Sequence, residues 1–204
     1  MKVVLATHNK DKRKEILPLL KPMGFEVLTL DKFPEIGDII EDGSTLTENA
    51  LIKARTVNQI TGLPTIADDT GLEVDALKGR PGIYSARFAG EGCRYSDNVN
   101  KLISEMNNIP ENKRTARFRT VTVFTDGKQE LIAEGTVEGF ITQKIKGVGG
   151  FGYDPVFYIP KSGKTFAEMT LDEKKEISHR GRAFRNMGRI IEQYLNISIT
   201  KENA

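Results

Sequence analysis

The chain has 204 residues, of which 38% are hydrophobic and 28% are charged. Its 30 Lys and Arg residues nearly balance its 28 Asp and Glu residues, which argues against a general nucleic-acid binder with a dominant basic patch. The single cysteine, Cys93, excludes an intrachain disulfide and indicates a reducing compartment. No apolar run approaches the ~20 residues that span a bilayer, and the short apolar stretch near the N-terminus does not resemble a secretory signal. We therefore expect a cytoplasmic protein without nucleic-acid or membrane partners.

The first thirty residues predict a strand, a helix and a second strand. Apart from Lys2, residues 2–6 are apolar and include two β-branched side chains, which is typical of a buried strand. A helix with apolar residues at helical spacing follows and ends near Gly24, and residues 25–30 form the next strand. This β-α-β opening indicates a parallel or mixed sheet. The apolar face of the helix is predicted to consist of Ile16, Leu17, Leu19 and Leu20.

A second helix and a third strand are predicted next. Thr45 and Glu48 have the spacing of a capping box at a helix start. Gly62 is suited to end that helix. Residues 65–67 read as a short buried strand that runs directly into an acidic turn, ADDTG, at residues 67–71.

The remaining chain predicts two more helices and a β-hairpin. Residues 95–107 and 178–195 are expected to be helical, the latter as an amphipathic helix. Residues 117–125 alternate polar with apolar side chains, Asp126-Gly127 is a two-residue hairpin signal, and the return strand covers residues 130–142. No linker or repeat divides the chain. We expect a single domain over residues 1–204 of the α/β class, with a mixed central sheet, flanking helices and two lobes.

The turn THNKDK, residues 7–12, is the first candidate site. It joins the first strand to the first helix, and the N–H groups and dipole of a helix start suit a phosphate. Hydroxyl, amide and ammonium groups add donors. The chain has no Walker loop of the form GxxxxGK[ST]. The alternative is a polar capping turn with solvated lysines.

The adjacent carboxylates Asp68 and Asp69 are the second candidate. They follow an apolar strand, and ligands bind at strand ends in open α/β sheets. Two neighbouring carboxylates are costly unless a cation or a proton compensates them. Mg²⁺ prefers oxygen ligands and substrate phosphates, and Glu41 or Asp42 could supply a further carboxylate. The alternative is a tight turn that uses Asp and Gly for its geometry.

The glycine-rich stretch GVGGFGYDP, residues 147–155, is the third candidate. Its glycines allow the backbone to approach a flat ligand. Phe151 could stack on a nucleobase, and Asp154 or backbone groups could hydrogen-bond to the edge of that base. The alternative is a flexible loop whose aromatic residues anchor in the core.

The stretch SHRGRA, residues 178–183, is the fourth candidate. Ser178 is suited to cap the last helix, which places His179 and Arg180 in its first turn. Positive side chains there oppose the helix dipole, and a bound anion or polar ligand could relieve this. The alternative is the basic face of a solvated helix.

In order and content, these motifs resemble the inosine triphosphate pyrophosphatases, which remove deaminated purine nucleoside triphosphates. THNKDK is similar to the phosphate loop of that family, and EDGSTLTENALIKA, IADDTGLEVDALKGRPGIYSARFAG, GGFGYDPVFYIP and EKKEISHRGRA are similar to four further signatures. The resemblance covers residue 3 to about 195. Asp42 and Leu46 depart from the usual family residues, at positions that carry no proposed catalytic role.

The resemblance implies an enzyme that hydrolyses ITP, dITP and XTP or dXTP to the monophosphate and pyrophosphate, with an Mg²⁺-activated water attacking the α-phosphorus. It implies Mg²⁺ ligands at Glu41 and Asp69, with Asp69 also the proton acceptor, and catalytic roles for Lys53 and Asp68. It also implies a homodimer and a long cleft between the lobes. The implied substrate-binding residues are Thr7, His8, Asn9, Lys10, Asp11, Lys12, Thr70, Phe151, Gly152, Tyr153, Asp154, Lys174, His179 and Arg180.

Two other functions are compatible with parts of the sequence. A regulatory module could bind the nucleotide without cleaving it, but a pure polyanion binder gains nothing from the apposed carboxylates at Glu41, Asp68 and Asp69. An enzyme that prefers modified pyrimidine triphosphates is disfavoured only by the resemblance.

Overall fold

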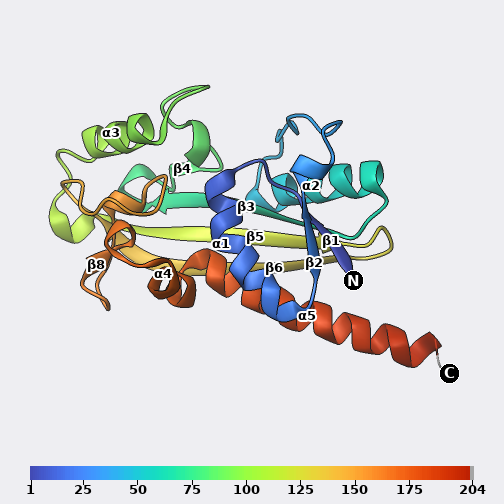
Figure 1. Cartoon of the computed structure of the whole chain (residues 1–204). Coiled ribbons are helices and arrows are strands. Elements are labelled where there is room, and N and C mark those ends of the chain that lie inside the picture. The colour runs from blue at the N-terminus through green and yellow to red at the C-terminus, as the bar shows by residue number, and fades with distance from the viewer. Residues whose placement is uncertain (203–204) are drawn as a thin grey trace. The chain divides into compact units, whose positions relative to one another are not determined.

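The computed structural model describes the backbone of residues 1–202 and the side chains of residues 1–196. It contains an eight-stranded sheet in the order β2-β1-β3-β5-β6-β7-β8, with β4 paired to β3 (Figure 1). This confirms the predicted α/β class with a mixed central sheet. The strands are β1 (Lys2–Leu5), β2 (Glu26–Thr29), β3 (Thr65–Val74), β4 (Pro81–Gly82), β5 (Thr115–Thr125), β6 (Glu130–Ile141), β7 (Phe157–Ile159) and β8 (Lys164–Thr165). The α-helices are α1 (Lys10–Leu20), α2 (Leu46–Thr61), α3 (Tyr95–Glu105), α4 (Leu171–Ile177) and α5 (His179–Glu202).

The chain forms two compact units. The first unit consists of Met1–Asp69, Thr120–Gly135 and Arg180–Ala204. The second unit consists of Thr70–Arg119 and Thr136–His179. Each unit is therefore built from segments that are far apart in the sequence.

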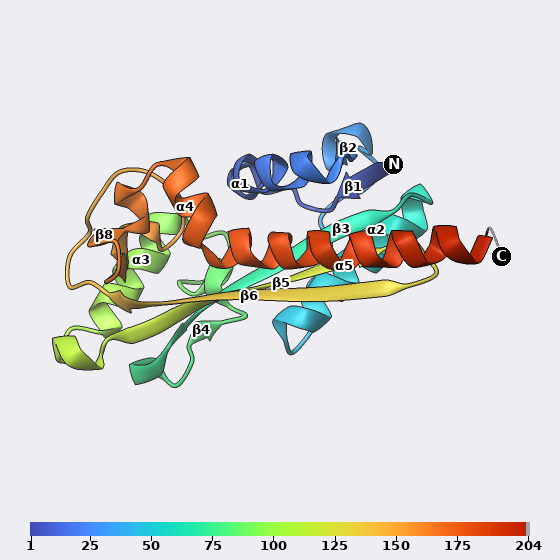
Figure 2. The ribbon, with the colours of Figure 1, turned by 90° about the horizontal axis from the view of Figure 1, so that it is seen from below.

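The first unit has the predicted β-α-β opening. β1 pairs in parallel with β2, and it pairs in parallel with β3 through Val4 opposite Thr65 and Leu5 opposite Ile66. α1 and α5 share one apolar cluster with these strands, and Figure 2 shows α2 on the other side of the strands from α1. The buried members of the cluster are Val3, Leu5, Ile16, Leu19, Leu20, Ile66, Phe124, Ala133, Phe184, Met187 and Ile191.

Three of the four residues predicted for the apolar face of α1 are buried, and Leu17 is wrong because it is 38% exposed. Leu17 lies between Ile16 and Leu20 in the sequence, but the turn of the helix points its side chain toward solvent. Glu15 takes the buried position instead. Burying this carboxylate requires a partner, which the site supplies.

The second unit has its own core, formed around β5, β6, β7 and α3. β7 pairs antiparallel with β6 through Phe140 opposite Tyr158 and with β8 through Ile159 opposite Lys164. Phenylalanine rings pack closely here, for example Phe118 against Phe157 with 4.7 Å between ring centroids. The core of the second unit thus depends on aromatic side chains that come from both halves of its sequence.

The acidic segment ADDTG does not form a turn, which corrects the prediction. β3 runs without interruption through TIADDTGLEV, and its carboxylates at Asp68 and Asp69 are buried. Asp and Gly are disfavoured in strands, so the local sequence predicted a turn. Cations from other elements stabilise the carboxylates inside the strand, as described below.

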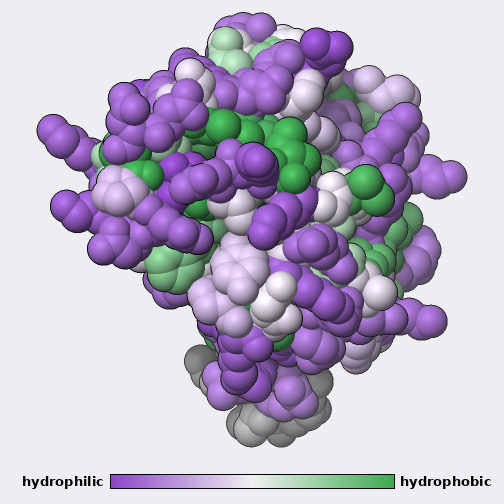
Figure 3. All heavy atoms as spheres, turned by 90° about the vertical axis from the view of Figure 1, so that its left-hand side faces the viewer, coloured by the Kyte–Doolittle hydropathy of each residue, from purple (hydrophilic) through white to green (hydrophobic). Residues whose placement is uncertain are grey.

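Hydrophilic residues cover most of the face of the molecule drawn in Figure 3, with hydrophobic residues gathered in patches between them. Over residues 1–202, the α-helices include none with a stretch sufficiently long and apolar to traverse a lipid bilayer.

Candidate nucleotide site

The start of α1 is capped by the side chain of Asn9. Asn9 Oδ1 accepts hydrogen bonds from the backbone N–H groups of Asp11 at 2.9 Å and Lys12 at 3.0 Å. Thr7 Oγ1 in turn accepts from the backbone N–H of Asn9 at 3.2 Å. The cap uses the N–H groups of residues 11 and 12, so the donors that remain at this helix start are chiefly side chains of the loop, together with the positive end of the helix dipole.

The other side chains of the loop point in different directions. Exposed His8 contacts the carbonyl oxygen of Gly37 through Nε2 at 3.1 Å. Asp11 forms an exposed ion pair with Lys14, with 3.0 Å between Oδ1 and Nζ. Lys12 reaches β3, where its Nζ lies 3.2 Å from Asp68 Oδ2. Lys12 is therefore the loop lysine that the fold itself places beside the acidic strand.

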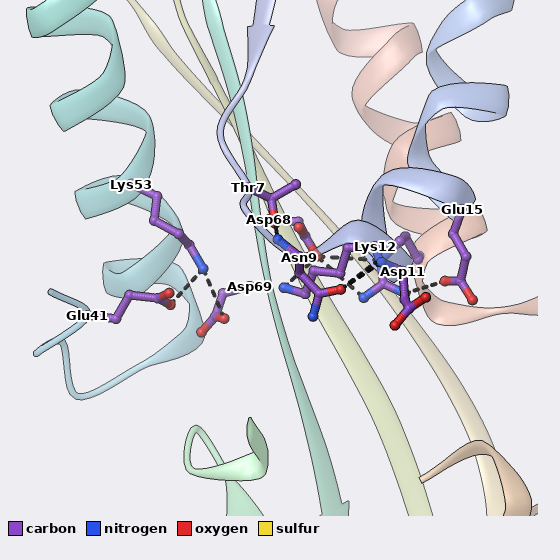
Figure 4. A network of polar contacts seen from close by, with 10 residues as sticks. Thr7, Asn9, Asp11, Lys12, Glu15, Glu41, Lys53, Asp68 and Asp69 are labelled. Carbon is purple, nitrogen blue, oxygen red and sulfur yellow. Dashed lines mark hydrogen bonds and ion pairs between the residues drawn. The ribbon is translucent and has the colours of Figure 1, made fainter. Parts of the chain in front are cut away.

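The alternation of β3 separates its two aspartates. Successive side chains of a strand point to opposite faces, so Asp68 contacts Lys12 while Asp69 contacts Lys53 on α2. Figure 4 shows the two groups of contacts on either side of the strand. The adjacent carboxylates thus form ion pairs with different lysines.

Lys53 links Asp69 to Glu41. The Lys53 ammonium lies 2.6 Å from Glu41 Oε2 and 3.2 Å from Asp69 Oδ1 (Figure 4). Burial lowers the pKa of Lys53, but the negative charges of Asp69 and Glu41 outweigh this effect and the pKa is raised. Lys53 is therefore held in its charged form, and one cation brings together two carboxylates that are distant in the sequence.

Asp68 is held by two cations. Besides Lys12, the guanidinium of Arg180 lies close to it, with 3.4 Å between Nε and Asp68 Oδ2. Burial raises the pKa of Asp68, but the charges of Lys12 and Arg180 outweigh burial and hold the pKa below its usual range. Burial lowers the pKa of Lys12, although Asp68 partly opposes the shift. The carboxylate is therefore ionised throughout the neutral range.

Arg180 also forms an ion pair with Glu15 through Nη1 and Oε2. Sequence analysis did not identify Glu15. Its only signal was a carboxylate at the edge of the apolar face of α1, one residue before Ile16. With Glu15 and Asp68 against it, the guanidinium of Arg180 is charge-compensated within the first unit.

The interpretation of SHRGRA as a solvated basic face is wrong for its first two charged residues. His179 and Arg180 are each 2% exposed, whereas Arg182 is exposed as predicted. The His179 ring stacks on Phe118 in the second unit, with 4.5 Å between ring centroids and 15° between ring planes. α5 begins directly after Ser178, as predicted for a capping residue.

In the second unit, Asp154 organises the glycine-rich loop. Asp154 Oδ2 accepts a hydrogen bond from the backbone N–H of Phe151 at 2.9 Å and forms an ion pair with Lys174 Nζ. Lys174 Nζ also lies over the Phe151 ring, 5.1 Å from its centroid. Tyr95, which sequence analysis did not identify, lies beside the same ring with 5.7 Å between centroids. The half-buried Phe151 ring is thereby held in place by a cation and a second aromatic side chain.

Tyr153 agrees with the alternative prediction for this loop, in which its aromatic residues anchor in the core. It is buried, and its hydroxyl donates a hydrogen bond to the carbonyl oxygen of Ser85 at 2.9 Å. Burial raises the pKa of this phenol. Gly152 has a left-handed backbone conformation with φ of 60°, which turns the chain between Phe151 and Tyr153.

The structure divides the predicted site residues between the two units. Residues 7–12, Glu41, Lys53, Asp68, Asp69 and Arg180 belong to the first unit. Thr70, residues 151–154, Lys174 and His179 belong to the second. Thr70 is half-buried and follows Asp69 on β3.

Among residues 1–196, no group of three or more His, Cys, Asp or Glu side chains is arranged to hold a metal ion. Glu41 and Asp69 nevertheless place oxygen atoms around a single cation, the Lys53 ammonium. This donor set fits Mg²⁺, which binds through one or two carboxylates and completes its coordination with water and substrate phosphates.

The amino-acid sequence of the chain is similar to a known protein family over nearly its whole length. A model of the Ham1 family matches residues 3–190. A dITP/XTP pyrophosphatase of Desulforamulus reducens is 48% identical over 192 residues, covering 94% of this chain and 96% of that protein. A dITP/XTP pyrophosphatase of Vibrio cholerae is 46% identical, covering 94% of this chain and 97% of that protein.

Solved structures also match the fold over nearly the whole chain. A HAM1 protein from Coxiella burnetii superposes with a TM-score of 0.86 at 36% identity, covering 95% of this chain and 99% of that one. The Ham1 protein of Staphylococcus aureus gives a TM-score of 0.85 at 35% identity, covering 95% of this chain and 100% of that one. The match in sequence and in fold extends over nearly the whole chain, which therefore belongs to the Ham1 family.

Proposed function

We propose that the chain is a nucleoside-triphosphate pyrophosphatase that hydrolyses deaminated purine nucleotides, namely ITP, dITP and XTP or dXTP, to the monophosphate and pyrophosphate. The observation that carries the proposal is the buried Lys53, shared by Glu41 and Asp69, together with Lys12 held beside Asp68. Lysines suit the phosphates of a polyanionic substrate, and the carboxylates beside them suit a divalent metal bound to that substrate. The names of the relatives support the choice of substrate.

In this proposal, Lys12 and Lys53 bind the phosphate oxygens, on which negative charge accumulates in the transition state. Both ammonium groups are held in position by carboxylates before the substrate binds. Asp69 accepts the proton of the water that attacks the α-phosphorus. Because Lys53 contacts it, Asp69 is oriented for that task.

Glu41 and Asp69 would hold Mg²⁺, with Asp68 kept apart on the opposite face of β3. A bound Mg²⁺ supplies charge neutralisation for the phosphates and lowers the pKa of coordinated water. A metal at these oxygens would compete with Lys53 for the negative charge of the two carboxylates, which would leave the Lys53 ammonium more available to the substrate phosphates.

The base would be recognised in the second unit by the Phe151 loop. Phe151 provides a ring for stacking, Lys174 provides a donor over that ring, and His179, stacked on Phe118 in the same unit, provides a further donor. Hypoxanthine and xanthine present an acceptor at O6, whereas adenine presents an amino donor there. An unsatisfied buried donor costs about 1–3 kcal/mol, which corresponds to roughly one to two decades of discrimination.

Incubation with Mg²⁺ and each of ITP, dITP, XTP, dATP, GTP and dUTP tests the proposal, with pyrophosphate and orthophosphate measured separately. We expect pyrophosphate from the first three substrates at rates well above those for the other three. Equal rates for all six would contradict the specificity, and release of orthophosphate alone would contradict the reaction. Binding without any turnover would indicate a regulatory module instead.

The substitution Asp69→Asn tests the role of the proton acceptor. We expect a loss of about three decades or more in kcat, because the neutral amide cannot accept the proton, while substrate binding remains measurable. Asp42→Asn, at an exposed carboxylate beside Glu41, is the matched control and should retain activity. Near-normal turnover of Asp69→Asn would remove this residue from the mechanism.

The family resemblance further supports a cytoplasmic homodimer. Light scattering coupled to size-exclusion chromatography measures the mass in solution, and a mass of twice that of the 22.7 kDa chain is expected. A monomer that is active at assay concentrations would contradict this part of the proposal.

A further inference from the structure

The second unit contains a cavity of about 780 Å³ that none of the residues assigned above to catalysis or substrate binding lines. Its volume is in the range of small-molecule sites, about 300–1,000 Å³. The wall comes from the turn before β5, the end of β6 and the β7–β8 connection. The lining residues are Glu111, Asn112, Arg114, Phe140, Ile141, Thr142, Gln143, Lys144, Lys146, Tyr158, Pro160 and Gly163.

Arg114 gives this cavity a buried positive charge. Its side chain is 2% exposed, and its guanidinium donates only to backbone carbonyl groups. Nε donates to Ile141 O at 2.7 Å, and Nη2 donates to Thr142 O at 3.0 Å. Nη1 donates to Met106 O at 2.6 Å and to Ile109 O at 3.3 Å. Carbonyl dipoles solvate the guanidinium but carry no net charge, so the positive charge persists.

The donor count of Arg114 leaves capacity for a ligand. A guanidinium has five N–H donors, and the four bonds to carbonyl groups leave one N–H on Nη2 without a protein acceptor among the described side chains and backbone. Among the same residues no carboxylate forms an ion pair with Arg114. Burial lowers the pKa of Arg114, and Glu111 opposes that shift.

Two exposed lysines extend the positive charge of the cavity. Lys144 and Lys146 line the same wall, and neither forms an ion pair with any side chain of residues 1–196. Glu111 is the one carboxylate in the lining, so three cations face a single anion. The formal excess of two positive charges matches a phosphate monoester, which carries about −1.5 to −2 charges at pH 7.

Two aromatic residues also line the cavity. Phe140 on β6 and Tyr158 on β7 are directly opposite each other in the antiparallel register and are both half-buried. Opposed residues point to the same face of a sheet, so both side chains lie on the same side of the β6–β7 pair. Pro160 continues this apolar surface. Such a surface suits a flat heterocycle, because aromatic stacking is tolerant of the particular base.

We propose that this cavity is a binding site for a nucleoside monophosphate, with the phosphate at Arg114, Lys144 and Lys146 and the base against Phe140 and Tyr158. The site is independent of the hydrolysis proposed above, since it shares no residue with it.

Calorimetric titration of the full-length protein with AMP, inorganic phosphate and adenosine tests the site. AMP is chosen because its 6-amino group is disfavoured by the proposed catalytic site. We expect saturable binding of AMP, and weaker binding of phosphate or adenosine alone, because each engages only half of the cavity. Equal affinity for AMP and inorganic phosphate would contradict the aromatic half. The absence of saturable AMP binding at millimolar concentrations would overturn the proposal, as would burial of the cavity in a dimer that excludes AMP.

Matched double variants locate the binding. Lys144→Ala/Lys146→Ala removes two exposed cations from the cavity, so the fold should persist and the Kd for AMP should rise at least about tenfold. Lys32→Ala/Lys128→Ala removes two exposed lysines of the first unit and should leave the Kd unchanged. Tyr158→Leu should weaken AMP more than inorganic phosphate. Equal affinities in the wild type and the Lys144/Lys146 variant would overturn the proposal.

The pyrophosphate assay on the same variants separates the two proposals. A wild type that releases no pyrophosphate from ITP contradicts the hydrolysis, whatever the outcome with AMP. Conversely, full pyrophosphate release by the Lys144→Ala/Lys146→Ala variant together with weakened AMP binding supports a distinct site.

Discussion

At the scale of single residues, charge compensation decides which polar side chains can be buried. Asp68 is 1% exposed and is flanked by Lys12 and Arg180, and Glu15 contacts Arg180 in turn. A buried charge without a partner is costly. Each member of this group therefore depends on the others, and none can be replaced by a neutral residue without leaving an uncompensated charge.

Asp68→Asn should be strongly destabilising, because it removes the carboxylate that contacts Lys12 and leaves Arg180 with the ion pair to Glu15. We expect a loss of about 3–5 kcal/mol in the free energy of unfolding, measured by urea denaturation at pH 7. Asp38→Asn, at an exposed aspartate, should change stability by no more than about 0.5 kcal/mol.

The stability that Asp68 contributes should depend on pH with a definite sign. Its folded pKa lies below the unfolded value of about 3.9, so the contribution is complete above that value and is lost as the pH falls toward the folded pKa. The difference in stability between wild type and Asp68→Asn should therefore shrink below pH 4. A constant difference would contradict the assignment.

The lowered pKa of Lys12 predicts that enzymatic activity is lost at alkaline pH. Burial lowers its pKa from the usual value of 10.5, so the charged form that binds phosphate is lost at a lower pH than for a solvated lysine. We expect kcat/KM for ITP to fall at alkaline pH, at a pH below the usual lysine pKa of 10.5. Lys12→Arg should move this limb to higher pH because arginine stays protonated, whereas Lys14→Arg, at an exposed lysine, should leave the profile unchanged.

At the scale of elements, the sequence predicted those features that local rules determine. The helix at α2 shows this well, since Thr45 caps it by accepting from the N–H of Glu48 at 3.1 Å and Gly62 ends it with φ of 65°. The hairpin of β5 and β6 followed equally from alternation and from Asp126-Gly127. Both features depend on residues within a few positions of one another.

β3 was mispredicted because its stabilising partners are distant. Its aspartates are stabilised in the strand by Lys12, Lys53 and Arg180, which lie on three other elements. No local sequence pattern predicts those contacts. The same reason explains why Glu15 and Tyr95 were missed, since each acquires its role from a partner more than 50 positions away.

The glycine-rich loop offers a test at the level of an element. Gly150 has φ of 68°, and a Cβ there would lie 2.1 Å from Asp154 Oδ2, the atom that holds Phe151 and Lys174. Gly150→Ala should therefore raise KM for ITP about tenfold or more, with a smaller effect on kcat.

Gly24→Ala is the matched control for backbone strain. Gly24 has φ of 69°, and a Cβ there would have no atom within 4 Å. It should cost stability of about 1 kcal/mol, as expected for a left-handed position, and leave KM unchanged. Equal KM values for both variants would show that the contact with Asp154 is unimportant.

At the scale of the whole molecule, folding should not require a metal. Lys53 already contacts both Glu41 and Asp69 and compensates one of their two negative charges in the absence of Mg²⁺, and the Glu41 side chain is 32% exposed to solvent. We expect EDTA to abolish pyrophosphate release while lowering Tm by less than about 2 °C, which corresponds to less than ~1 kcal/mol at this size.

Lys53→Met provides the contrasting case. With its cation removed, the carboxylate pair should bind Mg²⁺ without competition, so Mg²⁺ should raise the Tm of this variant more than that of the wild type. Identical Tm shifts in differential scanning calorimetry would argue against Glu41 and Asp69 as the metal ligands.

The division of Asp68 and Asp69 between the two faces of β3 has a consequence for how this protein can change. Because the two side chains are chemically identical, no substitution at either position can exchange their surroundings. A single inserted or deleted codon upstream in the strand would do so, by turning every following side chain to the opposite face. We therefore expect homologous genes to vary in length in the loops before Thr65 and after Val74, but not between these two residues.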